Sequence, residues 1–302
     1  MIFTPYFNQP NCCKLSNGEV DAIITTDIGP RIIRYAFPDA ENILAEIPEG
    51  GETTEYGEWH SYGGHRLWHA PEAMPRSYEP DNSPVPYEIL NDLSIRLTPA
   101  AEPHTGIQKE MTVYLASTGT ELTIDMKLIN RGPWPITAAP WGLTIMNGGG
   151  VSIFPQEPYR SHSEYLLPAR PFVLWHYTDL SDPRWRIGKK YICLSTDEAR
   201  TNPQKVGFMN KQGWAGYCRK NTLFIKQFPF VEGAEYCDYG CNNESYTVKS
   251  FMEIETLAPL SLINPGESTS YSEKWNLFSD FKMGSSDDEL DAALQGVLGS
   301  IR

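Results

Sequence analysis

The chain of 302 residues carries a formal net charge of −13, which argues against binding to nucleic acid phosphates and to anionic membranes, because both need a basic surface. Aromatic residues make up 12% of the sequence, and 24 prolines with 24 glycines favour many short strands joined by turns. Acidic and aromatic side chains together suit a neutral sugar or polyol, since carboxylates accept hydrogen bonds from hydroxyls and rings stack on C–H surfaces.

The sequence contains no recognisable targeting, membrane-spanning or cofactor-binding segment. Residues 1–19 lack the basic and apolar regions of a signal peptide, and no apolar run is long enough to span a bilayer. The six cysteines lack the paired spacing of a zinc site, so we expect reduced thiols in a cytoplasmic protein. A P-loop, a dinucleotide fingerprint, a GxSxG elbow and an HExxH helix are absent, and we therefore expect no cofactor.

The first predicted element is a hairpin made by residues 20–25 and 31–37. Both segments are rich in apolar and β-branched residues, and the turn between them contains Asp, Gly and Pro. Residues 48–57, which are rich in glycine and glutamate, are expected to form a surface loop.

Residues 57–75, GEWHSYGGHRLWHAPEAMP, form the densest cluster of polar and aromatic side chains and hold three of the six histidines. Three interpretations remain open: packed aromatics with histidines that cap turns, a ligand-binding loop, or a histidine-ligated metal. The spacing of His60, His65 and His69 weakens the metal interpretation, because it matches no helical pair followed by a carboxylate. The glycines at positions 63 and 64 permit unusual backbone angles or the close approach of a ligand.

Successive strands are predicted through residues 76–130, and two more between residues 205 and 230. His104 lies at a strand entrance, where an exposed turn histidine is one interpretation and a pocket residue the other. Lys226 shares a strand face with two phenylalanines. One interpretation is that its apolar stem is buried while its ammonium extends to solvent. The other is that it is a cation in the pocket, paired with Glu253 or Glu255.

Residues 247–256 alternate in a way that predicts one strand with Glu253 and Glu255 on the same face. Crowding raises the pKa of one of two neighbouring carboxylates, which suits a general base or the binding of several hydroxyls; a solvated strand face is the alternative. A turn at residues 264–267 leads into a second strand. Residues 285–300 are predicted to form an amphipathic helix that begins with Ser and Asp caps.

Three of these segments resemble the galactose mutarotase-like (aldose 1-epimerase) superfamily. The strand ending in IETL, followed by INPGES and EKWNLF, resembles its C-terminal signature, whose general-base glutamate matches Glu255, with Glu253 as the second candidate. DIGPRIIRYAF with ENIL resembles its opening hairpin. GGHRLWHAPE resembles its sugar-lining segment, with Arg66 and His65 as the nearest matches, and marks a distinct branch of the superfamily. The resemblance covers residues 17–278.

The resemblance implies an all-β fold: a large antiparallel β-supersandwich formed by residues 1–302 as one domain, with a short C-terminal helix. It also implies an epimerase-like enzyme that acts on a small-molecule carbohydrate, with Glu255 as the base and His65, His69 or His104 as the acid that protonates the ring oxygen. The second histidine of the epimerases has no counterpart, since the matching region holds Trp141. Tryptophan can stack on a sugar but cannot transfer a proton.

The missing histidine leaves a non-catalytic carbohydrate-binding or sensing protein as the alternative, and a polysaccharide lyase or hydrolase as a third possibility. We predict that one concave face of the large sheet gathers Glu255, Arg66, Trp141 and at least one of His65 and His69. Further candidates for substrate contacts are Glu253, Lys226, Trp68 and His104.

Overall fold

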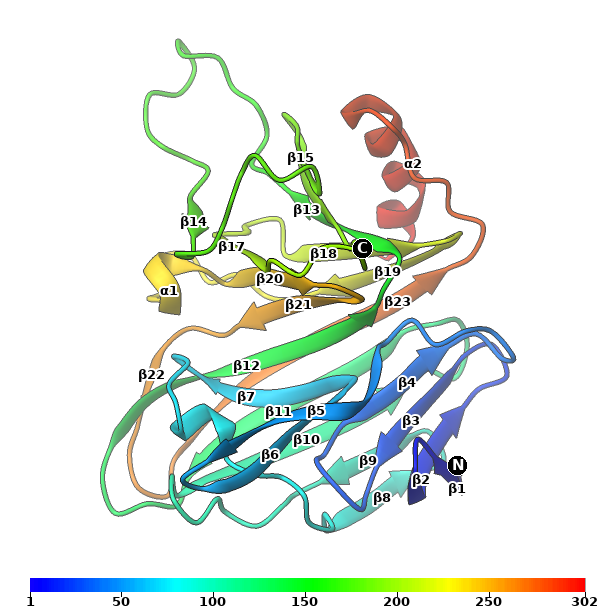
Figure 1. The fold of residues 1–302 in the computed structure, drawn as a ribbon, viewed down its shortest axis with the longest axis vertical. Helices are drawn as coiled ribbons and strands as arrows, with labels where there is room; N and C mark the ends of the chain where they lie inside the picture. Colours follow the sequence, from blue (N-terminus) through cyan, green and yellow to red (C-terminus); the bar gives the residue numbers. More distant parts are fainter. Residues whose placement is uncertain (302) are drawn as a thin grey trace.

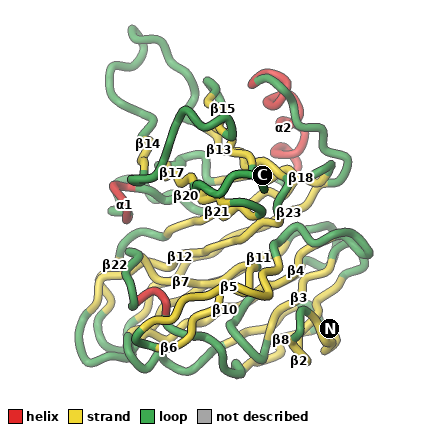
Figure 2. The backbone as a smooth tube through the Cα atoms, in the orientation of Figure 1, coloured by secondary structure: helices red, strands yellow, loops and turns green. Residues whose placement is uncertain are grey.

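The computed structural model describes residues 1–301, most of which lie in antiparallel strands and the turns between them (Figure 1). Within these residues the strands form two large sheets and a separate two-stranded hairpin. Figure 2 shows that helix is confined to short segments at the edges of the strand layers. The prediction of an all-β antiparallel sandwich with a short C-terminal helix is confirmed.

The first large sheet contains 11 strands among the described residues. Those on its main path are, in spatial order, β1 (Ile2–Tyr6), β2 (Gln9–Ser16), β3 (Asp21–Thr25), β4 (Ile32–Ala36), β7 (His65–Ala70), β12 (Ile136–Asn147), β21 (Phe251–Leu257), β20 (Asn243–Val248), β17 (Gln204–Phe208) and β14 (Phe172–Leu174). Beside that path, β22 (Ser261–Ile263) pairs with β12.

The second large sheet contains 10 strands within residues 1–301. In spatial order they are β15 (Trp185–Ile187), β16 (Tyr191–Ser195), β13 (Gly150–Pro155), β18 (Trp214–Arg219), β19 (Thr222–Gln227), β23 (Ser268–Phe278), β11 (Leu122–Asn130), β10 (Ile107–Leu115), β9 (Ser94–Leu97) and β8 (Tyr87–Asn91). The remaining elements are the hairpin strands β5 (Glu46–Thr54) and β6 (Gly57–Gly63), the 3-10 helix η1 (Arg76–Tyr78), the helical turn α1 (Cys237–Gly240) and the helix α2 (Asp287–Ser300).

The apolar core lies between the two large sheets. Met252 and Ile254 of β21 are fully buried there, in the same cluster as Trp275 of β23 from the opposite sheet. Each such buried side chain contributes about 1.5–3 kcal/mol relative to an exposed one. Because side chains alternate along a strand, burying Met252 and Ile254 turns Glu253 and Glu255 to the outer face of the first sheet.

Two predicted elements differ in detail from those in the structure. Residues 247–256 do not form one strand, because a turn at Lys249 and Ser250 divides them into β20 and β21; Lys249 has a φ of 51° there. Residues 48–57 are not a loop: they contain most of β5, the turn after it and the first residue of β6, and in this hairpin Glu52 pairs with Trp59. Strand β5 is polar and mostly exposed, so it lacks the apolar alternation by which a strand is recognised.

The predicted hairpin near the N-terminus and the C-terminal helix are both confirmed. Strands β3 and β4 pair antiparallel, and α2 begins with a capping box in which Ser286 and Glu289 satisfy each other's backbone N–H groups. Leu290 and Leu294 of α2 pack against an apolar cluster that the second sheet presents on its outer face. No helix in the described part of the chain combines the length and apolar character needed to cross a membrane.

Candidate active site

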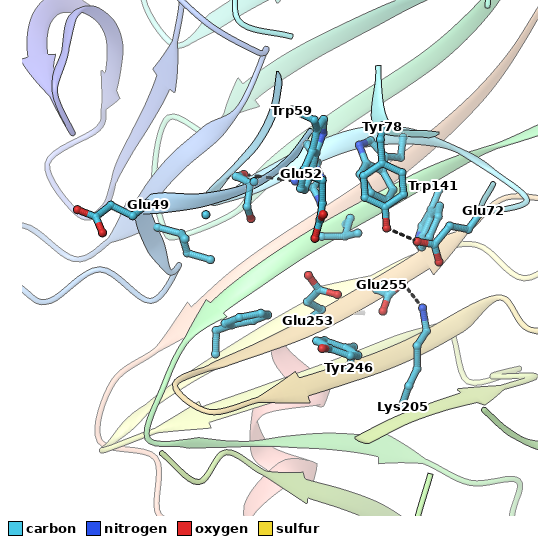
Figure 3. Close-up of a pocket in the computed structure, with 18 of the residues that line it drawn as sticks. Glu49, Glu52, Trp59, Glu72, Tyr78, Trp141, Lys205, Tyr246, Glu253 and Glu255 are labelled. Atoms are coloured by element: carbon cyan, nitrogen blue, oxygen red, sulfur yellow. Dashed lines mark hydrogen bonds and ion pairs between the residues drawn. The ribbon is translucent and has the colours of Figure 1, made fainter. Parts of the chain in front are cut away.

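A cavity of about 470 Å³ opens on the outer face of the first sheet (Figure 3). Its floor is formed by side chains from β7, β12, β21, β20 and β17, and its rim by the hairpin β5–β6 and the segment after β7. The strand register brings Arg66, Leu143, Glu255 and Glu244 into one row across the sheet. The cavity is therefore assembled from parts of the chain that are far apart in sequence.

One wall of the cavity is a stack of indoles around Arg66. The guanidinium carbon of Arg66 lies 4.7 Å from the ring centre of Trp59 and 4.2 Å from that of Trp68. Burial lowers the pKa of Arg66 to about 10. Trp68 meets Trp141 edge to face at 5.3 Å. These rings provide flat apolar surfaces on which the C–H face of a sugar can stack.

The opposite wall holds a buried lysine between two carboxylates. The ammonium of Lys205 lies 2.9 Å from Glu244 Oε2 and 3.1 Å from Glu255 Oε2. Burial opposes its charge, but the two carboxylates outweigh burial and raise the pKa of Lys205 well above its usual value. Burial also raises the pKa of Glu255, and the charge of Lys205 partly offsets this rise. Lys205 is thus a fixed cation that favours the ionised form of Glu255.

Glu255 keeps one carboxylate oxygen unused. The residue is fully buried and lines the cavity, and within residues 1–301 its Oε1 has no hydrogen-bond partner. A buried polar atom without a partner is costly, so it is normally satisfied by water or by a ligand. This oxygen is therefore available to accept a hydrogen bond or a proton from a molecule in the cavity.

Glu253 lies on the same face of β21 as Glu255, two residues before it. Burial, and then the charge of Glu255, raise the pKa of Glu253 to about 8, which Arg66 only partly offsets. At neutral pH the Glu253 carboxyl is mostly protonated, while Lys205 favours the ionised form of Glu255. Two carboxyl groups whose pKa values are pushed apart in this way can serve as an acid and a base in one reaction.

Tyrosines complete the polar lining of the cavity. The Tyr78 hydroxyl donates a hydrogen bond of 2.6 Å to Glu72 Oε1, and burial raises the pKa values of Tyr78 and Tyr177. Burial likewise raises the pKa of Tyr246 to about 12. Figure 3 shows Glu72 and Tyr78 on one side of the cavity, across from Glu253 and Tyr246. At neutral pH these phenols remain protonated, so Tyr177 and Tyr246 can donate hydrogen bonds to a ligand, while Tyr78 already donates its proton to Glu72 and can only accept one.

The cavity brings together more than half of the side chains named from sequence. Those that line it are Glu253, Glu255, Arg66, Trp68 and Trp141. The convergence predicted for Glu255, Arg66 and Trp141 is present in the structure.

His65 and His69 are not part of this convergence, although at least one of them was expected there. They alternate along β7 with Arg66 and Trp68, so they point into the layer between the sheets. His65 Nδ1 lies 2.9 Å from Thr144 Oγ1, and its ring meets Trp275 of the other sheet edge to face. Burial lowers the pKa values of both histidines well below the usual value, so both are neutral.

Lys226 and His104 also lie elsewhere. Lys226 belongs to the second sheet and points inward, with its ammonium 3.1 Å from Glu273 Oε1. Neither interpretation of Lys226 holds, because the side chain is fully buried and does not reach solvent, and its carboxylate partner is Glu273, not Glu253 or Glu255. His104 stacks on the ring of Tyr56 at 4.1 Å and contacts a carboxylate oxygen of Glu79 at 2.8 Å, outside the cavity. The part of the chain that the structure describes contains no cluster of three or more potential metal ligands.

Several lining residues were not predicted from sequence as site residues. They are Glu72, Tyr78, Tyr177, Lys205 and Tyr246. Lys205 carried a usable signal, because it is a charged residue at the start of the apolar run KVGF, where burial of a lysine requires a carboxylate partner. The tyrosines carried none, since aromatic side chains are frequent throughout the sequence.

Comparison with solved structures identifies the fold. The chain is similar to the Slr1438 protein from Synechocystis sp. PCC 6803, with a TM-score of 0.56 and 13% identity over 93% of this chain and 99% of that one. It is also similar to a galactose mutarotase-like protein from Lactobacillus casei ATCC 334, with a TM-score of 0.55 and 11% identity over 89% of this chain and 100% of that one.

A galactose mutarotase-like protein from Clostridium acetobutylicum gives a TM-score of 0.51 and 12% identity over 92% of this chain and 98% of that one. No protein-family model and no curated protein matches the sequence. At such low identities the likeness is one of architecture alone. The chain has the galactose mutarotase-like fold.

Proposed function

We propose that the protein is an epimerase-like enzyme that binds a sugar in this cavity and uses Glu255 as its general base. The observation that carries the proposal is the free Oε1 of Glu255, a buried carboxylate oxygen among indole and phenol rings. A sugar supplies what such a cavity lacks, because it combines hydroxyl donors with an apolar C–H face. The mutarotase-like fold supports the same class of ligand.

The reaction we propose interconverts the two anomers of an aldose. Glu255 accepts the proton of the anomeric hydroxyl while an acid protonates the ring oxygen, so that the bond between C1 and the ring oxygen breaks and an open-chain aldehyde forms. Rotation about the C1–C2 bond, followed by the reverse proton transfers, closes the ring with the opposite configuration at C1. No proton is gained or lost over the cycle.

Glu253 takes the role of the acid in this proposal. The two histidines of β7 lie behind the sheet, whereas Glu253 lines the cavity beside the base. Its pKa of about 8 keeps it protonated at neutral pH and close to the optimum for proton transfer. Lys205 is a weaker candidate, because its pKa is raised well above the usual value and it gives up its proton less readily.

A second candidate function is sugar binding without chemistry. It is favoured by the cavity lining, which within the described residues includes no imidazole, the group expected as the acid from the family resemblance. The two functions share the ligand and differ in turnover, so one pair of measurements separates them.

The test is polarimetry on freshly dissolved α-D-glucose and α-D-galactose, with calorimetry on the same sugars. We expect the protein to accelerate mutarotation and Glu255→Gln to reduce the acceleration about 10²–10⁴-fold. The matched control is Glu88→Gln, on the exposed edge strand β8 of the other sheet, which should keep full activity. Saturable binding without acceleration would favour the non-catalytic function, and a fully active Glu255→Gln variant would refute the assignment of the base.

A further inference from the structure

Three polar side-chain atoms of residues that line the cavity have no hydrogen-bond partner within residues 1–301. They are Oε1 of Glu255, Nε of Arg66 and Nε1 of Trp141. The proposed function uses the first, and the second belongs to a guanidinium that lies against the rings of Trp59 and Trp68. The third is a buried indole N–H, and a buried donor without an acceptor is costly unless water or a ligand supplies one.

Trp141 is a fixed part of the cavity wall. Its side chain is 2% exposed and packs edge to face with Trp68, and the ammonium of Lys205 lies over its ring, 5.4 Å from the ring centre. The N–H lies in the plane of the ring, at its edge, so a hydrogen bond from it does not compete with stacking on the ring face. Because an indole N–H only donates, it requires an oxygen acceptor from the ligand.

The unpaired donor of Trp141 and the unpaired acceptor of Glu255 come from adjacent strands. Leu143 of β12 is directly opposite Glu255 of β21, and Trp141 is two residues before Leu143 on the same outer face. Trp141 and Glu255 are therefore diagonal neighbours with Cα atoms about 7–8 Å apart, which is within reach of large side chains. Lys205 connects them, since its ammonium lies over the indole and 3.1 Å from Glu255 Oε2.

We propose that the indole N–H of Trp141 donates a hydrogen bond to the anomeric oxygen of the bound sugar, the same oxygen from which Glu255 removes a proton. The inference rests on the proposed function and adds a third group to its chemistry, after Glu255 and Glu253. One hydroxyl satisfies both unpaired atoms at once, because it donates one hydrogen bond and accepts others. The ring oxygen cannot do so, since it has no proton to give to Glu255 and has to receive the proton of Glu253.

This hydrogen bond strengthens as the sugar ring opens. Glu255 takes the proton of the anomeric hydroxyl, and the electron pair left on that oxygen forms the C1=O double bond while the bond between C1 and the ring oxygen breaks. Negative charge develops on the anomeric oxygen, where a fixed donor in a buried site stabilises it. Glu253 protonates the ring oxygen, and Trp141 keeps its own proton throughout.

The first test is NMR spectroscopy of the wild-type protein with ¹⁵N-labelled indoles. The ligands are D-galactose, D-glucose and the corresponding 1,5-anhydro alditols, which keep the ring oxygen but lack the anomeric one. The chain has eight tryptophans, and either Trp141→Phe or Trp141→Tyr identifies the signal of Trp141 by its loss. We expect the sugars to move the Trp141 indole proton downfield, as a new hydrogen bond does. The anhydro alditols should bind more weakly and, at saturation, leave this proton in place.

The second test is kinetic. Trp141→Phe keeps an aromatic ring and removes the donor, so we expect kcat for mutarotation to fall at least about tenfold while KM stays within about threefold. A variant that only loosened the cavity wall would raise KM instead. Trp134→Phe is the matched control, because Trp134 is 75% exposed and lies outside the cavity, and it should keep the wild-type kcat.

An unshifted Trp141 signal with a saturating sugar, an equal shift with the anhydro alditols, or an unchanged kcat in Trp141→Phe would overturn the inference and leave the proposed function intact. Binding without acceleration would refute the enzymatic function, and the NMR shift then decides alone whether the hydrogen bond exists. If neither sugar binds, the proposed function fails, and this inference fails with it.

Discussion

At the scale of single residues, Glu253 and Glu255 show how neighbouring carboxyl groups acquire different properties. They share a strand face, but only Glu255 forms an ion pair with Lys205. The cation that lowers the pKa of Glu253 most is Arg66, whose guanidinium also lies over the rings of Trp59 and Trp68. The pair titrates as a unit, with the proton held mostly on Glu253. Position relative to one lysine therefore decides which of the two carboxyl groups is more readily ionised.

The raised pKa of Glu253 makes a prediction about stability. Between pH 4.5 and about 8 the unfolded chain has lost this proton and the folded chain retains it, so the free energy of unfolding falls as pH rises through that window. Glu253→Gln removes this cost. We expect the variant to melt about 5–10 °C above the wild type at pH 8.5, because a pKa raised from 4.5 to about 8 costs up to about 5 kcal/mol there, and at the same temperature at pH 4.

Scanning calorimetry at the two pH values measures this difference. Glu88→Gln is the control and should show no pH-dependent gain. An equal gain for Glu253→Gln at both pH values would mean that packing, and not the proton, is responsible.

At the scale of strands, a buried ion pair lies directly behind the candidate site. Lys226 of β19 pairs with Glu273 of β23 and donates hydrogen bonds to the carbonyl oxygens of Gly142 on β12 and Ile254 on β21, at 3.0 and 3.2 Å. A Cβ atom at position 142 would lie 2.1 Å from Glu273 Oε1, so a larger residue there would displace the carboxylate that pairs with Lys226. The pair thus ties the two strands that carry Trp141, Glu253 and Glu255 to the opposite sheet.

Breaking this pair should be far more costly than replacing it. Lys226→Met leaves the Glu273 carboxylate buried without its cation, and we expect a loss of about 3–5 kcal/mol in the free energy of unfolding. Lys226→Met combined with Glu273→Gln should recover most of that loss, because no buried charge remains. Urea denaturation of the two single variants and the double variant measures the coupling, and additive losses would contradict it.

Strand β7 shows which part of the site can be predicted from the sequence and which part cannot. Alternation separates His65 and His69 from Arg66 and Trp68, and the sequence shows that separation plainly. It does not show which pair faces the cavity, because every residue of β7 is buried, one face by the core and the other by the site. A strand buried on both faces carries no polar stripe to mark its outer side.

At the scale of the whole molecule, the sequence predicts where individual strands and turns lie better than it predicts which strands are adjacent in the sheets. The opening hairpin, the turn near residue 265 and the C-terminal helix depend on local signals such as glycine, proline and helix caps, and they were recovered. The sequence left open whether Lys226 is a pocket cation and did not single out Lys205, and the outcome for both lysines has a non-local cause. Both lysines lie in buried strands, and only the order of strands in the two sheets decides which one meets Glu255.

The separation of the hairpin β5–β6 from both large sheets has a consequence for the dynamics of the protein. An isolated two-stranded hairpin is marginally stable in water, and this one is tied to β12 at its base, where Ala45 N–H donates to the Ile145 carbonyl.

We expect the amide hydrogens of the hairpin to exchange with solvent by local opening, far faster than those of β12 and β21. Because Trp59 and the Glu49–Glu52 segment line the cavity, a bound sugar should slow exchange in this hairpin selectively. Hydrogen-exchange mass spectrometry with and without ligand measures the effect, and uniform protection across the sheets would contradict it.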